Sequence, residues 1–303
     1  EDVLAPGEYP VTFRITGPNG IAWERKANVY VPAVAAHEDG PLALPVLNEE
    51  VVLNGPAGSY QLVANVEQGA APLGRSWRFS LSREDALPRL KRTITIWGIE
   101  EKAESWLRAH EIAGQQFSGT SVGSGEIILV GDLSKLKRNA RQNSDERDWA
   151  ELVRRIDKGS AAIFLSPHAF QQRNDPVGWL PLKKKGRCYK YFDWLYHKEC
   201  IAKNHPIFAG LQCGGILDWY DYGPMIPHYL FDGQDTPAEV VAAAFATGYD
   251  APGGYASGML LGSYRRGQGT FVLNTFPVLE NLDQHPAADR LLLNLIDYST
   301  RFI

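Results

Sequence analysis

Hydrophobic and polar residues alternate along the first 84 positions of the chain. In residues 9–16, three apolar side chains fall on one face of an extended strand and polar ones on the other: Val11, Phe13 and Ile15. This two-residue period is typical of a strand with one buried face. It returns in three further segments, separated by turns rich in glycine, proline or asparagine: residues 22–31, 60–66 and 77–82. Short alternating strands with such turns predict a β-sandwich over residues 1–84.

The pattern changes after a short linker at residues 85–91. Three compact apolar runs are typical of buried strands: residues 93–97, 126–130 and 160–165. Between them, apolar residues recur every three or four positions, which predicts helices over residues 100–110 and 145–158. Ser144 is the expected N-cap of the second helix, and Gly159 the glycine that ends it. Strands that are apolar on both faces and alternate with helices predict a parallel sheet covered by helices, in an α/β domain over residues 92–303.

The rest of this domain is expected to add strands and a closing helix. Residues 242–249, 257–264 and 269–275 are predicted strands, and residues 286–298 a helix. A long insertion, residues 166–235, shows no clear period. Because it is far longer than a normal connection, we expect short local structure or a functional surface within it.

The composition excludes several classes of protein. A formal net charge of -4 over 303 residues argues against a general nucleic-acid-binding protein. No apolar stretch reaches the roughly 18 residues of a membrane span. Three cysteines (Cys188, Cys200 and Cys213) match neither a complete disulfide framework nor a zinc site, and their redox state is left open. The chain starts without Met or a signal-like run, so we expect it to be processed or cut from a longer protein.

The sequence lacks the motifs of common hydrolases and cofactor-binding proteins. Ser166 follows a predicted strand, but not in the Gly-x-Ser-x-Gly turn of a nucleophile, so we expect it to cap that turn. Cys213 lies in a glycine turn and is expected to be a small packed residue. Residues 119–125 are rich in glycine and serine but lack the lysine and the helix of a phosphate loop. His197 and His205 are not spaced as zinc ligands, and we predict neither a metal ion nor a cofactor.

Aromatic residues concentrate in the long insertion. Residues 186–231 contain eleven of them, interleaved with acidic residues and His197, whereas the whole chain is 11% aromatic. Aromatic rings beside carboxylates and imidazoles can bind sugars. The apolar face of a sugar ring stacks on an aromatic ring, and its hydroxyls donate hydrogen bonds to the polar groups. Aromatic side chains also hold irregular segments and protein interfaces together. Both interpretations stay open, with packing or an interface preferred over a ligand site.

Two acidic residues in the insertion invite comparison with a glycosidase. Asp218 and Asp221 are three positions apart, and glycoside hydrolases use a pair of carboxylates. Such a pair is usually gathered from different elements of the fold. A glycoside hydrolase in its own right is therefore only the third interpretation of this chain, after packing or an interface and glycan binding.

Several segments resemble the C-terminal region of large bacterial proteins of the glycoside hydrolase family 2 type. They are residues 44–46, 55–58, 194–198, 205–211, 214–223, 254–258, 271–275, 280–282 and 285–292. The resemblance covers nearly the whole chain. It implies an immunoglobulin-like β-sandwich followed by a flavodoxin-like three-layer α/β domain, similar to class I glutamine amidotransferases and to galactosidase trimerisation domains.

The resemblance implies an accessory role rather than catalysis. In that family the catalytic acids lie in a TIM barrel, which this chain does not contain, and the cysteine of the amidotransferase nucleophile turn is missing. We therefore expect a non-catalytic region of a carbohydrate-active enzyme, periplasmic or secreted, without nucleic-acid or membrane partners. Its expected partners are the catalytic barrel of the same or a partner chain, an oligosaccharide, or a second copy. The candidate contact residues are Trp194, Tyr196, His197, Asp218, Trp219 and Tyr222.

Overall fold

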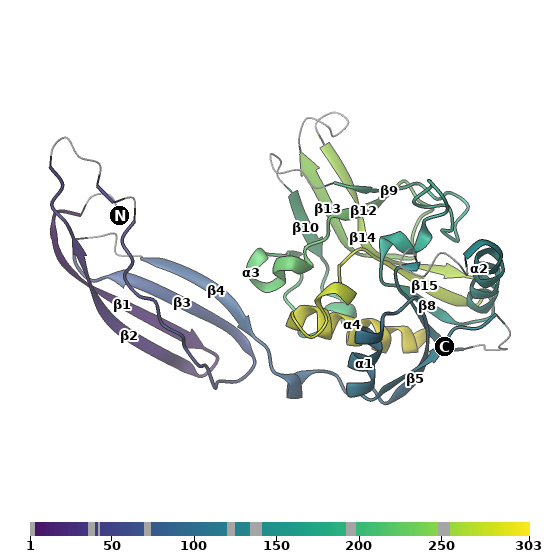
Figure 1. Cartoon of the computed structure of the whole chain (residues 1–303), viewed down its shortest axis with the longest axis horizontal. Helices are drawn as coiled ribbons and strands as arrows, with labels where there is room; N and C mark the ends of the chain where they lie inside the picture. Colours follow the sequence, from purple (N-terminus) through teal and green to yellow (C-terminus); the bar gives the residue numbers. More distant parts are fainter. Residues whose placement is uncertain are drawn as a thin grey trace. The chain divides into compact units, whose positions relative to one another are not determined.

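The computed structural model describes residues 4–35, 40–41, 43–69, 74–119, 125–133, 141–191, 198–247 and 255–303 (Figure 1). The chain divides into two compact units, Glu1–Ala86 and Leu87–Ile303. The first unit is built from strands and the second from a large sheet with helices, so the chain combines a β unit with a mixed α/β unit. None of the helices among these residues combines the length and the apolar character required of a membrane span.

The first unit is a four-stranded antiparallel sheet with the order β2-β1-β3-β4. Its strands are β1 (Gly7–Gly17), β2 (Gly20–Val31), β3 (Gly58–Val66) and β4 (Arg75–Leu81). The predicted hairpin forms between β1 and β2, with only Pro18 and Asn19 between the paired residues Gly17 and Gly20. Gly20 has φ +99°, a conformation that L side chains rarely adopt, which explains the glycine.

One face of this sheet carries the small core of the unit. Val11, Ile15, Val29 and Tyr60 are buried there. Residues 43–57 form no strand, although Glu49 accepts two hydrogen bonds from Arg25 of β2, at 2.6 and 2.8 Å. The segment contains two prolines, which cannot donate backbone hydrogen bonds to a sheet. The described residues of this unit therefore contain one sheet, and the predicted immunoglobulin-like pairing of two sheets stays a prediction.

The second unit contains an eleven-stranded sheet with a parallel half and an antiparallel half. The parallel half has the order β6-β5-β7-β8-β15, and β14, β13, β10 and β11 continue it antiparallel. The parallel strands are β5 (Arg92–Trp97), β6 (Ile112–Gln116), β7 (Ile127–Val130), β8 (Ala161–Phe164) and β15 (Gly269–Asn274). The others are β9 (Arg187–Lys190), β10 (Lys198–Ala202), β11 (Gly215–Ile216), β12 (Tyr229–Asp232), β13 (Glu239–Thr247) and β14 (Tyr255–Arg266).

Helices cover both faces of the parallel half (Figure 1). Ile127 and Leu129 of β7 share a core with α1 (Glu101–Ala109) and α4 (Pro286–Ser299). The alternate residues Ile128 and Val130 share a second core with α2 (Arg141–Asp157). All four side chains are fully buried, as the continuous apolar run predicts for a strand between two helical layers.

Two local predictions have different outcomes around α2. The helix begins at Arg141, so Ser144 lies inside it and the N-cap prediction is wrong. Gly159 has φ +109°, and its N–H donates to the carbonyl of Ile156 at 3.0 Å, as expected for the glycine after a helix. The hydrophobic pattern of the sequence did not predict β6 or β10.

Candidate functional site

The long insertion, residues 166–235, contributes four short strands to the large sheet. It supplies β9, β10, β11 and β12, together with the short helix α3 (Trp219–Tyr222). Of the six predicted contact residues, Trp194, Tyr196 and His197 lie outside the described residues. The structure places the other three on α3 and at its start: Asp218, Trp219 and Tyr222.

Asp218 serves the start of α3. Its Oδ1 accepts the backbone N–H of Asp221 at 2.9 Å, which is the role of an N-cap carboxylate. The two carboxylates of the proposed glycosidase pair thus belong to one turn of a four-residue helix. In glycosidases the two carboxylates usually come from separate elements, which place them on opposite sides of the sugar bond. Asp218 and Asp221 do not have this arrangement.

Tyr222 and Trp219 lie in opposite environments although they share α3. Tyr222 is fully buried, and its hydroxyl donates a hydrogen bond to the carbonyl of Gln212. Burial raises the pKa of this phenol well above its usual range. Trp219 is 69% exposed and Tyr220 57% exposed. Tyr222 therefore holds the helix in place, whereas Trp219 and Tyr220 offer their rings to solvent.

The other described aromatics of the insertion also divide by burial. Five are buried in the core: Phe170, Tyr191, Phe208, Tyr222 and Phe231. The Tyr191 hydroxyl donates to the carbonyl of Pro227 at 3.0 Å and lies 3.2 Å from the sulfur of Cys200. Packing, the interpretation preferred from the sequence, thus accounts for these side chains.

Exposed apolar side chains gather at the β11 edge of the large sheet. Ile201 of β10 pairs with Ile216 of β11, so their side chains lie on the same face, and they are 40% and 52% exposed. Trp219 and Tyr220 follow within four residues of Ile216. We call these four residues the edge patch. Large apolar side chains that are exposed together are typical of interaction surfaces.

Ser166 is not a nucleophile on a strained turn. Its backbone is extended, with φ -141° and ψ 137°, and its hydroxyl accepts the N–H of His168 at 3.2 Å. It caps the turn Pro167–Phe170, as expected from the sequence. Cys213 lies 3.5 Å from the side-chain oxygen of Asn204 and is partly buried. The side chain of Ser166 thus has a structural role in the turn that follows β8.

A partly buried cluster around His205 lies at the start of β13. His205 Nδ1 accepts the N–H of Ile207 at 3.2 Å, and its Nε2 lies 3.2 Å from a carboxylate oxygen of Glu239. The hydroxyl of Tyr298 donates to the same oxygen at 3.4 Å. Burial lowers the pKa of His205, although Glu239 acts in the opposite direction. Because both ring nitrogens are used in fixing the chain, this cluster is structural.

A stack of aromatic rings lies at the carboxyl ends of β5 and β6. The sequence pattern did not predict it. Trp97 stacks on Phe117, with ring centres 4.9 Å apart, and meets the edge of Trp149 at 5.4 Å. Trp149 in turn stacks on Trp179 at 5.8 Å. Trp149 is buried, and the other three are partly exposed. No single segment carries more than one of these rings, so no local pattern indicates them.

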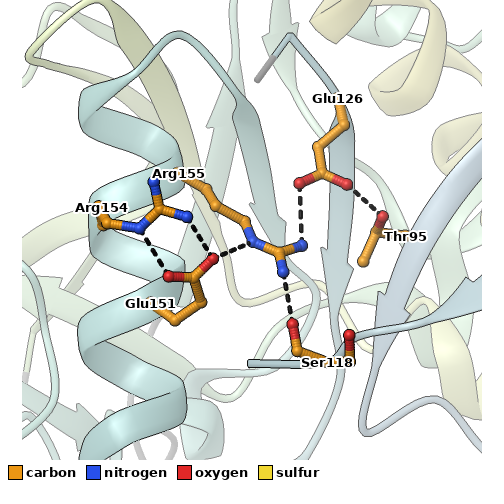
Figure 2. A network of polar contacts seen from close by, with 6 residues as sticks. All are labelled: Thr95, Ser118, Glu126, Glu151, Arg154 and Arg155. Atoms are coloured by element: carbon orange, nitrogen blue, oxygen red, sulfur yellow. Dashed lines mark hydrogen bonds and ion pairs between the residues drawn. The ribbon is translucent and has the colours of Figure 1, made fainter. Parts of the chain in front are cut away.

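An ion-pair network lies beside this stack (Figure 2). The guanidinium of Arg155 is 1% exposed and binds Glu126 at 3.0 Å and Glu151 at 2.8 Å. It also donates to the carbonyl of Ser118 and lies 4.5 Å from the ring centre of Phe117. Arg154 and Arg155 hold the pKa of Glu151 at about 2. Each of the four charged side chains in Figure 2 is bonded to at least one partner of opposite charge, which is typical of a structural network.

Within the residues that the structure describes, no group of three or more histidine, cysteine or acidic side chains is placed to hold a metal ion.

No protein-family model matches the chain, and no curated protein matches it. Among solved structures, it is similar to the cytoplasmic protein STM3548 from Salmonella typhimurium, with 11% identity and a TM-score of 0.42. That match covers 69% of this chain and 99% of the other.

Proposed function

We propose that this chain is a non-catalytic accessory region of a bacterial glycoside hydrolase, whose second unit packs against the catalytic barrel of the same or a partner chain. The proposal includes an immunoglobulin-like first unit and an amidotransferase-like second unit, in a periplasmic or secreted enzyme. It is carried by one observation. The described polar side chains that a hydrolase site would use instead cap helices and turns: Ser166, His205 and Asp218. The edge patch, in contrast, leaves four large apolar side chains exposed to solvent.

The composition of the edge patch favours a protein partner. Ile201 and Ile216 are branched aliphatic residues, which fill the apolar centre of protein interfaces. A sugar ring needs flat aromatic faces and polar groups that pair its hydroxyls. Trp219 and Tyr220 meet the first of these needs, so glycan binding by α3 is the second candidate function.

Activity and glycan binding can be tested on the purified chain. We expect no hydrolysis of a panel of nitrophenyl glycosides, and no retardation in native gels that contain soluble polysaccharides. Hydrolysis that Asp218→Asn abolishes would overturn the non-catalytic assignment. Retardation that Trp219→Ala abolishes would instead establish the glycan-binding alternative.

Packing against a barrel calls for a proximity measurement in the producing organism. A photo-crosslinking amino acid at position 219 is expected to give cross-links to peptides of a glycoside hydrolase barrel. The same amino acid in place of the exposed Lys102 of α1 is the matched control and should give none. Cross-links from position 219 that stay within residues 1–303 would contradict the proposal.

A further inference from the structure

The two ends of the main strand order of the large sheet, β11 and β6, are built differently. At one edge, β11 consists of two residues and pairs with two residues of β10. At the other edge, β6 is five residues long and pairs with β5 along its whole length, from Ile112 opposite Arg92 to Gln116 opposite Ile96. An edge strand leaves every second backbone N–H and C=O on its outer side free to pair with another strand.

The sequence of β6 contains none of the devices that usually protect such an edge. Proteins blunt their edge strands with charges, prolines, bulges or short length. β6 reads Ile-Ala-Gly-Gln-Gln, without a charge or a proline, and its register with β5 is regular. Its last four residues are exposed. Among the described residues of the second unit, no strand pairs with the outer side of β6.

We propose that β6 pairs antiparallel with β6 of a second copy of this chain, which joins the two large sheets across a two-fold axis at Gly114. This inference concerns the sheet edge opposite the edge patch and is independent of the proposed function.

The sequence of β6 is complementary to itself in this arrangement. With the axis at Gly114, Ala113 lies opposite Gln115 of the second copy, and Ile112 lies opposite Gln116. No like charges face each other, and two-fold pairing of identical patches is the commonest symmetry of homo-oligomers. Glycine at the axis removes the side chain that would meet its own copy. The neighbouring helix α1 exposes both signs of charge, with Glu101, Lys102 and Arg108, so it adds no strong repulsion.

Sedimentation equilibrium over a range of protein concentrations tests this pairing. The wild-type chain is expected to change from the mass of one copy to that of two as its concentration rises. Ala113→Lys with Gln115→Lys places lysines opposite lysines in the dimer and should keep the chain at the mass of one copy. Both side chains are exposed, so the thermal midpoint of the double variant should match that of the wild type.

A charge-swapped partner controls for other effects of the lysines. The variant Ala113→Glu with Gln115→Glu is also expected to stay a single copy, whereas an equal mixture of the two double variants should form dimers. Ile216→Lys, at the opposite edge, should leave the self-association of the wild type unchanged. The proposal is overturned if the wild type keeps the mass of one copy at every concentration. It is equally overturned if the lysine variant dimerises like the wild type, or if the mixture fails to dimerise.

Discussion

Replacing Arg155 by alanine should destabilise the second unit more than any other single change in the ion-pair network. The guanidinium is 1% exposed, and its partners Glu151 and Glu126 are 12% and 22% exposed. Its removal leaves two carboxylates without their shared cation, in positions that water reaches only in part. It also removes the cation from the face of Phe117.

The size of the effect follows from these exposures. Removing one partner of a fully buried ion pair costs about 3–5 kcal/mol. Glu151 keeps its bonds to Arg154, and Glu126 keeps its bond to Thr95, so the lower end of that range applies. We expect a loss of about 3 kcal/mol in the free energy of unfolding. Arg154 binds the same glutamate but is 37% exposed, and Arg154→Ala should cost about 0.5 kcal/mol or less.

Urea denaturation followed by tryptophan fluorescence measures both variants. Trp149 lies on α2 beside the network and reports on the second unit. Equal losses for Arg154→Ala and Arg155→Ala would refute the argument, because both arginines contact Glu151 and differ mainly in burial. A small loss for both would show that water compensates the exposed carboxylates.

Two further predictions concern titration and thiol reactivity. Burial lowers the pKa of His205, whose neutral ring accepts the N–H of Ile207. The stability that the neutral ring provides is complete above the unfolded-state pKa of about 6.5. It is lost as the pH falls through the lower pKa of the folded state. His205→Asn keeps an acceptor without titrating, so its thermal midpoint should fall less than that of the wild type between pH 7 and pH 5, and an equal fall would contradict this. Ellman's reagent should modify Cys213 first, because Cys188 and Cys200 are buried. Burial also raises the pKa of Cys188 to about 12. Cys213→Ser should remove the fast phase, and a fast phase that persists in this variant would contradict the assignment.

Periodicity predicted the elements that carry a strong apolar pattern and missed those that do not. β1 follows from alternation, and β7 follows from a continuous apolar run. β6 has one buried side chain, that of Ile112, so its position is set by pairing with β5 rather than by its own sequence. β10 is fixed in the same way, by β13.

The candidate site was harder to predict because exposure depends on distant contacts. Trp219 and Tyr222 are three positions apart and both aromatic, yet Tyr222 packs in the core beside Phe208 while Trp219 is exposed. Asp218 looked like a catalytic acid by residue type, but its carboxylate caps α3. A sequence pattern shows which groups are available, whereas their use depends on which hydrogen bonds the fold completes.

The position of Arg155 also has a consequence for how this chain can change in length. Its guanidinium binds both the carbonyl of Ser118 and the carboxylate of Glu126, the residues on either side of the connection between β6 and β7. The two ends of that connection are therefore fixed to one side chain of α2, whatever lies between them. Each doubling of a flexible loop costs only about 0.6 kcal/mol in closure entropy. Insertions between Ser118 and Glu126, natural or engineered, should consequently leave both of these contacts and the sheet intact.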